Sequence, residues 1–125
     1  MFLVDTSVWV DHLRASNPAL RQLLNDGLVL MHPFVIGELA LGSLKNRKGV
    51  LANLKELPLA VSAEHEEVMR LMEQRALWSR GIGWIDLHLI ASALLSGCRL
   101  WTLDGGMQKA AAAARVQAGG AAFTA

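Results

Sequence analysis

The chain has 125 residues, of which 53% are hydrophobic and 18% are charged, so it is too apolar for a disordered protein and long enough to bury one core. Twelve Lys and Arg residues against eleven Asp and Glu residues give a formal net charge of +1. This balance excludes a strongly basic coat for nucleic acid, although a local basic patch remains compatible with it. The single cysteine, Cys98, excludes an intrachain disulfide and a zinc site built from cysteines. We expect one domain over residues 1–125.

No segment has the pattern of an export signal or of a membrane-spanning helix. Asp5 interrupts the apolar start of the chain, and no basic residue precedes it. Residues such as Glu38, His88 and Arg99 interrupt the later apolar stretches well short of the roughly 18 residues that a spanning helix needs. We therefore expect a soluble protein of the reducing cytoplasm.

Short apolar runs alternate with helical patterns in the first half of the chain. Thr6 and Ser7 are suited to cap a first helix, and Asn17 followed by Pro18 is a typical start of a second. Pro58 points to an edge position for the strand that contains it. These patterns predict strands at residues 2–4, 28–31 and 57–61, and helices at residues 8–14, 18–25 and 34–41 and up to about residue 55.

The second half of the chain continues the alternation. The patterns predict helices at residues 63–79, 85–96 and 107–116, a strand at residues 98–103 and one weak strand at residues 121–125. Strands that alternate with helices indicate an α/β domain with a mainly parallel central sheet flanked by helices. In such open sheets, functional groups gather at the carboxyl ends of the strands. Asp5 and Asp104 each follow a predicted strand.

Four of the eleven acidic residues stand in apolar surroundings: Asp5, Glu38, Asp86 and Asp104. Each has an ordinary structural explanation, because Asp86 is placed to cap its helix and Asp104 stands in a glycine-rich turn. That explanation is weakest for Glu38, since its apolar helix offers no Lys or Arg one turn away. The alternative is that all four side chains converge at one end of the sheet.

Convergence of these acids would require either protonation or a cation to offset their repulsion. Two carboxylates about 4 Å apart repel each other by about 4 kcal/mol at an effective dielectric constant of about 20. Either some of them are protonated or a divalent ion compensates their charge. Ligation by oxygen alone favours Mg²⁺ or Mn²⁺ over zinc, and such ions support metal-assisted hydrolysis of phosphodiesters.

At these residues the chain resembles the PIN-domain family, and specifically the small VapC-like toxins of bacterial toxin–antitoxin operons. The matching segments span nearly the whole chain in the order of the family, and they are Leu3–Trp9, Ile36–Leu39 with Gly42, Gly81–Asp86 continuing into Leu89–Ala93, and Leu100–Asp104. The resemblance implies a three-layer PIN-like sandwich of helices around a parallel sheet. It also implies a Mg²⁺- or Mn²⁺-dependent endoribonuclease that forms a homodimer and is inhibited by a cognate VapB-like antitoxin.

Carried over residue by residue, the resemblance makes Asp5, Glu38, Asp86 and Asp104 the catalytic, metal-binding acids. Ser7 and Thr6 then become supporting hydroxyls that orient Asp5 or a bound water. Thr102 has two open interpretations, as a similar support beside Asp104 or as a strand residue that faces the core. Gly105 and Gly106 depart from the charged residues that many relatives carry after the fourth acid, and we expect them to loosen the turn at Asp104. The expected products carry a 5′-phosphate and a 3′-hydroxyl.

Contacts to RNA are harder to assign. The densest basic run contains Lys45, Arg47 and Lys48, and it either holds RNA phosphates near Glu38 or forms a solvated loop between helices.

Tryptophan residues suggest stacking on bases, but each has another explanation. Trp101 is expected to be buried in a strand, and Trp9, Trp78 and Trp84 are equally suited to an antitoxin groove or a dimer interface.

Three other functions are weighed against the nuclease. A phosphoacceptor receiver domain needs an acidic pair after its first strand and a late Lys, and a haloacid-dehalogenase-like phosphatase needs a second acid two residues after Asp5, where Ser7 stands. The remaining alternative is a PIN-like module that binds RNA or its antitoxin without cleaving. Retention of four costly acids argues against it.

Overall fold

The computed structural model describes residues 1–119, and the weak strand expected at residues 121–125 lies outside them. A short parallel sheet forms the centre, with strands β1 (Phe2–Val4), β2 (Val29–Leu30) and β3 (Arg99–Trp101) in the order β2-β1-β3. In the central strand, Leu3 is fully buried and pairs with Leu30 on one side and Leu100 on the other. Burial on both faces explains why these strands are continuous apolar runs.

The edge strand expected at residues 57–61 is reduced to one parallel bridge between Met31 and Leu59. The Met31 N–H donates to Pro58 O, and the Ala60 N–H donates to Met31 O, each at 2.8 Å. Because Pro58 has no N–H, the segment cannot extend its ladder further on that side. The expected edge position is confirmed, but the expected length is wrong.

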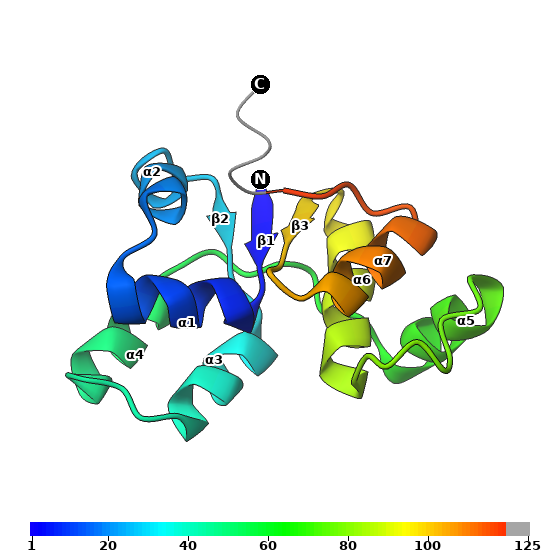
Figure 1. Cartoon of the computed structure of the whole chain (residues 1–125), viewed down its shortest axis with the longest axis horizontal. Helices are drawn as coiled ribbons and strands as arrows, with labels where there is room; N and C mark the ends of the chain where they lie inside the picture. Colours follow the sequence, from blue (N-terminus) through cyan, green and yellow to red (C-terminus); the bar gives the residue numbers. More distant parts are fainter. Residues whose placement is uncertain (120–125) are drawn as a thin grey trace.

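Helices α1 (Thr6–Ala15), α2 (Pro18–Asn25), α3 (Pro33–Leu41) and α4 (Arg47–Lys55) lie toward the β2 side of the sheet (Figure 1). The start of α2 is the one expected from sequence, since the Asn17 side chain accepts a hydrogen bond from the Leu20 N–H at 3.0 Å and Pro18 takes the first helical position. At the start of α1 the expectation is wrong. Asp5 is the N-cap residue, and the hydroxyls of Thr6 and Ser7 donate elsewhere.

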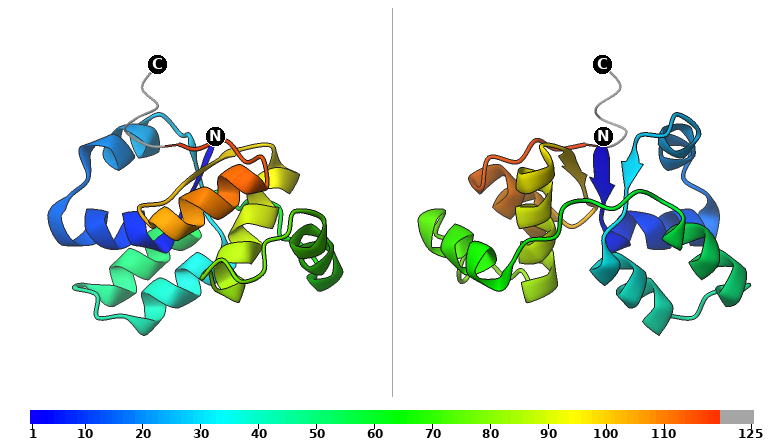
Figure 2. Two further views of the ribbon diagram at one scale, coloured as in Figure 1. Left: turned by 45° about the vertical axis from the view of Figure 1, so that its right-hand side comes forward. Right: turned by 180° about the vertical axis from the view of Figure 1, so that it is seen from behind.

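Helices α5 (His65–Gln74), α6 (Trp84–Ser96) and α7 (Gly105–Ala113) lie toward the β3 side, and the view from behind shows the same division (Figure 1, Figure 2). Helix α6 is the most deeply buried, with every residue from 87 to 93 in the core. It ends at Gly97, whose φ of +61° favours glycine.

Helix α5 is shorter than the expected helix at residues 63–79. Ala76 and Ser79 adopt positive φ values of 51° and 58°, which are incompatible with a continuing helix. Leu77 nevertheless reaches the core, because its N–H bonds back to Met72 O at 3.0 Å as the chain reverses. The apolar pattern therefore continued past the point where the helix ended.

The last helix begins two residues earlier than expected. Asp104 caps α7 by accepting the Met107 N–H at 2.9 Å, so Gly105 and Gly106 form the first helical turn and not a loosened one. Arg115, with φ of 65°, follows the helix end.

The carboxyl ends of the strands meet at one edge of the sheet. Helix α1 begins directly after β1, α3 begins shortly after β2, and α7 begins shortly after β3 (Figure 1). The expected α/β sandwich with a parallel central sheet is confirmed.

Candidate functional site

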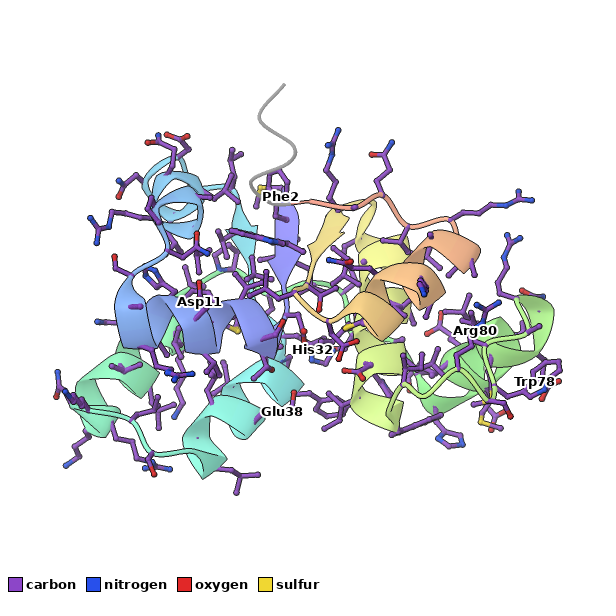
Figure 3. All side chains as sticks on the ribbon, viewed as in Figure 1. Phe2, Asp11, His32, Glu38, Trp78 and Arg80 are labelled. Carbon is purple, nitrogen blue, oxygen red and sulfur yellow. The ribbon has the colours of Figure 1, made fainter. Side chains whose placement is uncertain are left out.

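The four acids singled out from sequence stand on four elements around this edge. Asp5 follows β1, Glu38 lies in the middle of α3, Asp86 lies in the first turn of α6, and Asp104 caps α7. Figure 3 shows Glu38 below the end of β1. Asp5 is only 5% exposed, Glu38 and Asp86 are half-buried, and Asp104 is exposed.

Asp5 is fixed by two hydroxyl groups. Ser7 Oγ donates to Asp5 Oδ2 at 2.9 Å, and Thr102 Oγ1 donates to the same oxygen at 2.8 Å. Each hydroxyl oxygen in turn accepts a backbone N–H, from Leu103 at 3.0 Å and from Asp104 at 3.1 Å respectively. The network joins the ends of β1 and β3 and leaves Asp5 Oδ1 free of partners within residues 1–119.

Glu38 is held by a single hydroxyl group from helix α1. Thr6 Oγ1 donates to Glu38 Oε1 at 2.8 Å, a contact that joins α1 to α3. Thr6 thus contacts Glu38 and not Asp5, while Thr102, which had two open interpretations, contacts Asp5 while remaining buried.

The surroundings of Asp86 change how readily its carboxyl binds a proton. Burial raises the pKa of its carboxyl above the ordinary value, and the negative charges of Asp5 and Asp104 raise it further. The Gly83 N–H, which donates to Asp86 Oδ2 at 3.1 Å, opposes this shift. The three aspartates therefore act on one another electrostatically.

The four carboxylates share one arrangement. Each receives its hydrogen bonds on one oxygen from uncharged hydroxyl or backbone N–H groups, and its second oxygen has no partner in the part of the chain that the structure describes. The capping explanation holds for Asp86 and Asp104, but it uses only half of each carboxylate.

A donor set made only of carboxylate oxygens fits a hard divalent cation. The arrangement is open, because no three Asp, Glu, His or Cys side chains within residues 1–119 lie close enough together to hold a metal ion. A cation bound by fewer carboxylates would keep water in its remaining positions.

The basic residues between Lys45 and Lys48 differ in their contacts and positions. Arg47 donates to Ala40 O at the end of α3 from Nε at 3.2 Å and from Nη2 at 2.9 Å, so it fastens α4 to α3. Lys48 is exposed on the first turn of α4, and Lys45 lines a groove.

That groove runs between α1 and α3 and has a volume of about 420 Å³. Glu38 lines it together with apolar residues that include Val10 and Leu13, and the basic residues Arg14 and Lys45 also line it. Val10 and Leu13 are 40% and 37% exposed, so the groove offers an apolar surface that continues to one of the acids.

Contacts between imidazole and aromatic rings of α3 and α6 were not predicted from the sequence, although Trp84 itself was considered. Phe34 contacts His88 with ring centroids 5.0 Å apart, and His88 contacts Trp84 at 4.8 Å. Phe34 stands one helical turn before Glu38, a spacing that was available as a signal. Of the tryptophans left open, Trp9 is buried, which excludes it from a groove or an interface, while Trp101 is buried as expected.

The sequence is similar to a known protein family and to individual ribonucleases. The PIN domain family matches residues 2–113. The chain is 50% identical over 116 residues to Ribonuclease VapC32 of Mycobacterium tuberculosis, from strain CDC 1551 / Oshkosh and from strain ATCC 25618 / H37Rv, with 90% of this chain and 91% of each relative covered.

Two solved structures share the fold. FitAcB from Neisseria gonorrhoeae has a TM-score of 0.63 at 22% identity, covering 94% of this chain and 96% of that one. PAE2754 from Pyrobaculum aerophilum has a TM-score of 0.57 at 18% identity, covering 87% and 78%. Along residues 1–119 no helix is both long and apolar enough to cross a membrane. The matched family and the half-identical relative, added to four acids at the expected edge of a parallel sheet, establish that the chain belongs to the PIN-domain family as a VapC-like member.

Proposed function

We propose that the protein is a metal-dependent endoribonuclease and the toxin of a toxin–antitoxin pair. The observation that carries the proposal is the set of four carboxylates, from four elements, that each keep one oxygen free. The relative named Ribonuclease VapC32 supports it, because half of its residues are identical over nine-tenths of the chain.

Mg²⁺ or Mn²⁺ would bind among Asp5, Glu38, Asp86 and Asp104, with at most two of the carboxylates as direct ligands and the others reaching the ion through water, because no three such side chains within residues 1–119 lie close enough together to hold it. When bound, the ion supplies an activated water and neutralises charge on the phosphate oxygens. It would also offset the repulsion from Asp5 and Asp104, which adds to the effect of burial in raising the pKa of Asp86.

The chain's own residues prepare the site. Ser7 and Thr102 hold Asp5 in one orientation through its Oδ2 atom, which leaves Oδ1 available to an ion. Thr6 does the same for Glu38 from one side. Such fixed carboxylates favour in-line displacement at phosphorus, with products that carry a 5′-phosphate and a 3′-hydroxyl.

The partners follow from the surface. An antitoxin segment with apolar side chains fits the groove between α1 and α3, where it would cover Glu38 and exclude RNA. Lys45, Arg47 and Lys48 are exposed and would contact RNA phosphates, and Arg47 also bonds Ala40 O. A homodimer and a cytoplasmic location belong to the same proposal.

The decisive experiment is RNA cleavage by the purified protein, freed of any partner, with and without Mg²⁺ or Mn²⁺. The variant Asp5→Asn keeps an oxygen for the Ser7 and Thr102 hydroxyls but removes the charge. Asp26→Asn is the matched control, because Asp26 is exposed in the turn before β2 and bonds only Gln22 among the described side chains. We expect metal-dependent fragments with 5′-phosphates from the parent and from Asp26→Asn, and none from Asp5→Asn.

Two results would change the proposal. Equal cleavage by Asp5→Asn and the parent would exclude the four-acid site. RNA binding without cleavage by the parent would favour a non-cleaving RNA- or antitoxin-binding module.

A further inference from the structure

The loop between α5 and α6 runs directly past two of the four acids. At the end of the loop, the Gly83 N–H donates to Asp86 Oδ2 at 3.1 Å. Earlier in the loop, the backbone lies against the first turn of α7. A Cβ atom added to Gly106 would lie 4.0 Å from Arg80 O and 3.2 Å from Asp104 Oδ1. These two contacts place the backbone of Arg80 beside the acids, on the β3 side of the sheet.

The Arg80 side chain is exposed, and its guanidinium group is held along one edge only. Its Nε donates to Ala76 O at 3.1 Å, so the group lies between α7 and the end of α5 (Figure 3). Its two Nη groups have no hydrogen-bond partner within residues 1–119. The backbone turns on both sides of the residue, because Ser79 and Gly81 have positive φ values of 58° and 75°. Arg80 therefore offers free N–H donors from a fixed position in the loop.

Charge at this edge of the sheet opposes the approach of a phosphodiester. The four acids receive their hydrogen bonds from uncharged hydroxyl and backbone N–H groups, which leave their negative charge in place. On the α3 side, Lys45 lines the same groove as Glu38. Arg80 lies on the other side, next to α7. An RNA strand that crosses the acids would therefore meet a cationic side chain on each side of them, which offsets the repulsion of its phosphates.

We propose that Arg80 binds a phosphate of the RNA backbone beside the scissile one and thereby positions the substrate across the acids. The proposal rests on the proposed nuclease function and adds a substrate-binding residue to it. A guanidinium group donates two parallel N–H bonds to one phosphate, and the two Nη groups of Arg80 are available for them. Contacts to phosphates fix the register of a nucleic acid without reading its bases. Arg80 therefore contributes to the affinity for RNA of any sequence and not to the chemical step.

Two assays on the same variants test the proposal. The first measures kcat and KM for cleavage of a fluorescein-labelled RNA oligonucleotide that contains a mapped cleavage site. The second measures binding of that RNA over a series of salt concentrations in the Asp5→Asn background, which prevents cleavage. Arg80→Gln removes the charge, and Arg80→Lys keeps the charge without the planar fork. Arg70→Gln is the matched control, because Arg70 is exposed on α5 and lines a groove with the second half of α6, away from Asp86.

We expect Arg80→Gln to raise KM about tenfold and to leave kcat unchanged, which is the pattern for a contact made equally in the ground state and the transition state. In the binding assay, the slope of log K against log salt concentration should be smaller by about 1, because one phosphate contact is lost. Arg80→Lys should restore the slope, since the slope counts charges. Arg70→Gln should match the parent in both assays. A merely structural effect would lower kcat and would not leave the salt slope of Arg80→Lys intact.

A KM and a salt slope in Arg80→Gln that equal those of Arg70→Gln would overturn the proposal. A loss of affinity for the antitoxin alone would also overturn it, because the guanidinium group would then serve a protein partner. Failure of this proposal is distinct from failure of the nuclease. In the first case the parent cleaves RNA and Arg80→Gln cleaves it equally well. In the second case the parent cleaves no RNA with either ion, while the salt slopes still report whether Arg80 contacts a phosphate.

Discussion

The hydroxyls of Ser7 and Thr102 determine which oxygen of Asp5 is available. A hydroxyl has one proton, and each of these two accepts a backbone N–H, so both protons are free to point at Asp5 Oδ2. The 3.4 Å approach of the two hydroxyl oxygens is therefore a consequence of their shared acceptor. Two donated bonds on one oxygen stabilise a carboxylate that is 5% exposed, and they leave Oδ1 for an external partner.

His32 is a buried histidine that depends on its neutral form. Its Nδ1 accepts the Phe34 N–H at 3.0 Å, so the ring proton is on Nε2, which is buried without a partner among residues 1–119. Burial, together with the nearby His88, lowers the pKa of His32 to about 4. The folded protein thus resists protonation at a position that protonates readily in the unfolded chain.

This difference predicts an acid-sensitive stability. Between pH 6.5 and pH 4, His32 binds a proton in the unfolded chain but not in the folded protein. As the pH is lowered through this range, the free energy of unfolding should therefore fall by up to about 1.4 kcal/mol per pH unit because of this group. His32→Asn retains an acceptor for the Phe34 N–H and removes the titration. Urea unfolding at several pH values should show a shallower slope for His32→Asn than for the parent. Parallel slopes in the two proteins would contradict the assignment.

At the scale of elements, α1 and α3 contribute both to the site and to the groove beside it. Thr6 ties the first turn of α1 to Glu38, while Val10 and Leu13 continue along α1 into the groove. One pair of helices therefore carries one of the four acids and the apolar surface that we propose for the antitoxin.

A charge placed in this groove should separate the two activities. Leu13→Glu puts a carboxylate on an apolar surface that a bound segment must desolvate, and we expect antitoxin affinity to fall by more than about tenfold. RNA cleavage by the free toxin should be unchanged. Leu41→Glu is the matched control, since Leu41 is 90% exposed on α3 and does not line the groove. Calorimetry with the cognate antitoxin checks the result, and equal affinities for both variants would place the antitoxin elsewhere.

Elements were predictable where local chemistry decides them. The apolar run at β1, the Asn17-Pro18 start of α2 and the Gly97 end of α6 are each specified by a few neighbouring residues. The end of α5 was not, because Leu77 keeps the apolar period while the backbone reverses at Ala76. The periodic spacing of apolar residues indicates which residues are buried, but a residue can be buried without lying in a helix.

Contacts between distant segments were not predictable in the same way. The four acids were found because each looks out of place in its own surroundings. Thr102 reaches Asp5 across 97 positions in the sequence, and Phe34 of α3 contacts His88 of α6, and no local pattern specifies either contact. Arg47 belongs to the basic run expected to contact RNA, and its hydrogen bonds to Ala40 O were not indicated by the sequence.

At the scale of the whole molecule, parallel topology concentrates negative charge. Strands β1 and β3 end side by side, so Asp5 and Asp104 follow them to one edge, and α6 delivers Asp86 to the same place. Burial and these two charges raise the pKa of Asp86, which means that the folded protein binds a proton there more readily than the unfolded chain does. The stability of the metal-free protein should therefore fall as pH rises through the titration of Asp86.

Removing the charge of Asp86 should stabilise the metal-free protein and reduce the gain in stability that the ion provides. Asp86→Asn keeps an oxygen for the Gly83 N–H, so we expect a higher Tm than the parent in EDTA at neutral pH. Mn²⁺ at 100 times its Kd should stabilise the parent by about 2.7 kcal/mol and the variant much less, because an ion that binds only the folded state stabilises by mass action. Asp26→Asn should follow the parent in both conditions. Thermal melts with and without Mn²⁺ measure the rise in Tm that the ion produces. Equal rises in Asp86→Asn and the parent would show that the ion binds away from Asp86. A rise that is lost only in Asp86→Asn would show that the ion binds at the edge of the sheet where the charge of Asp86 lowers the stability.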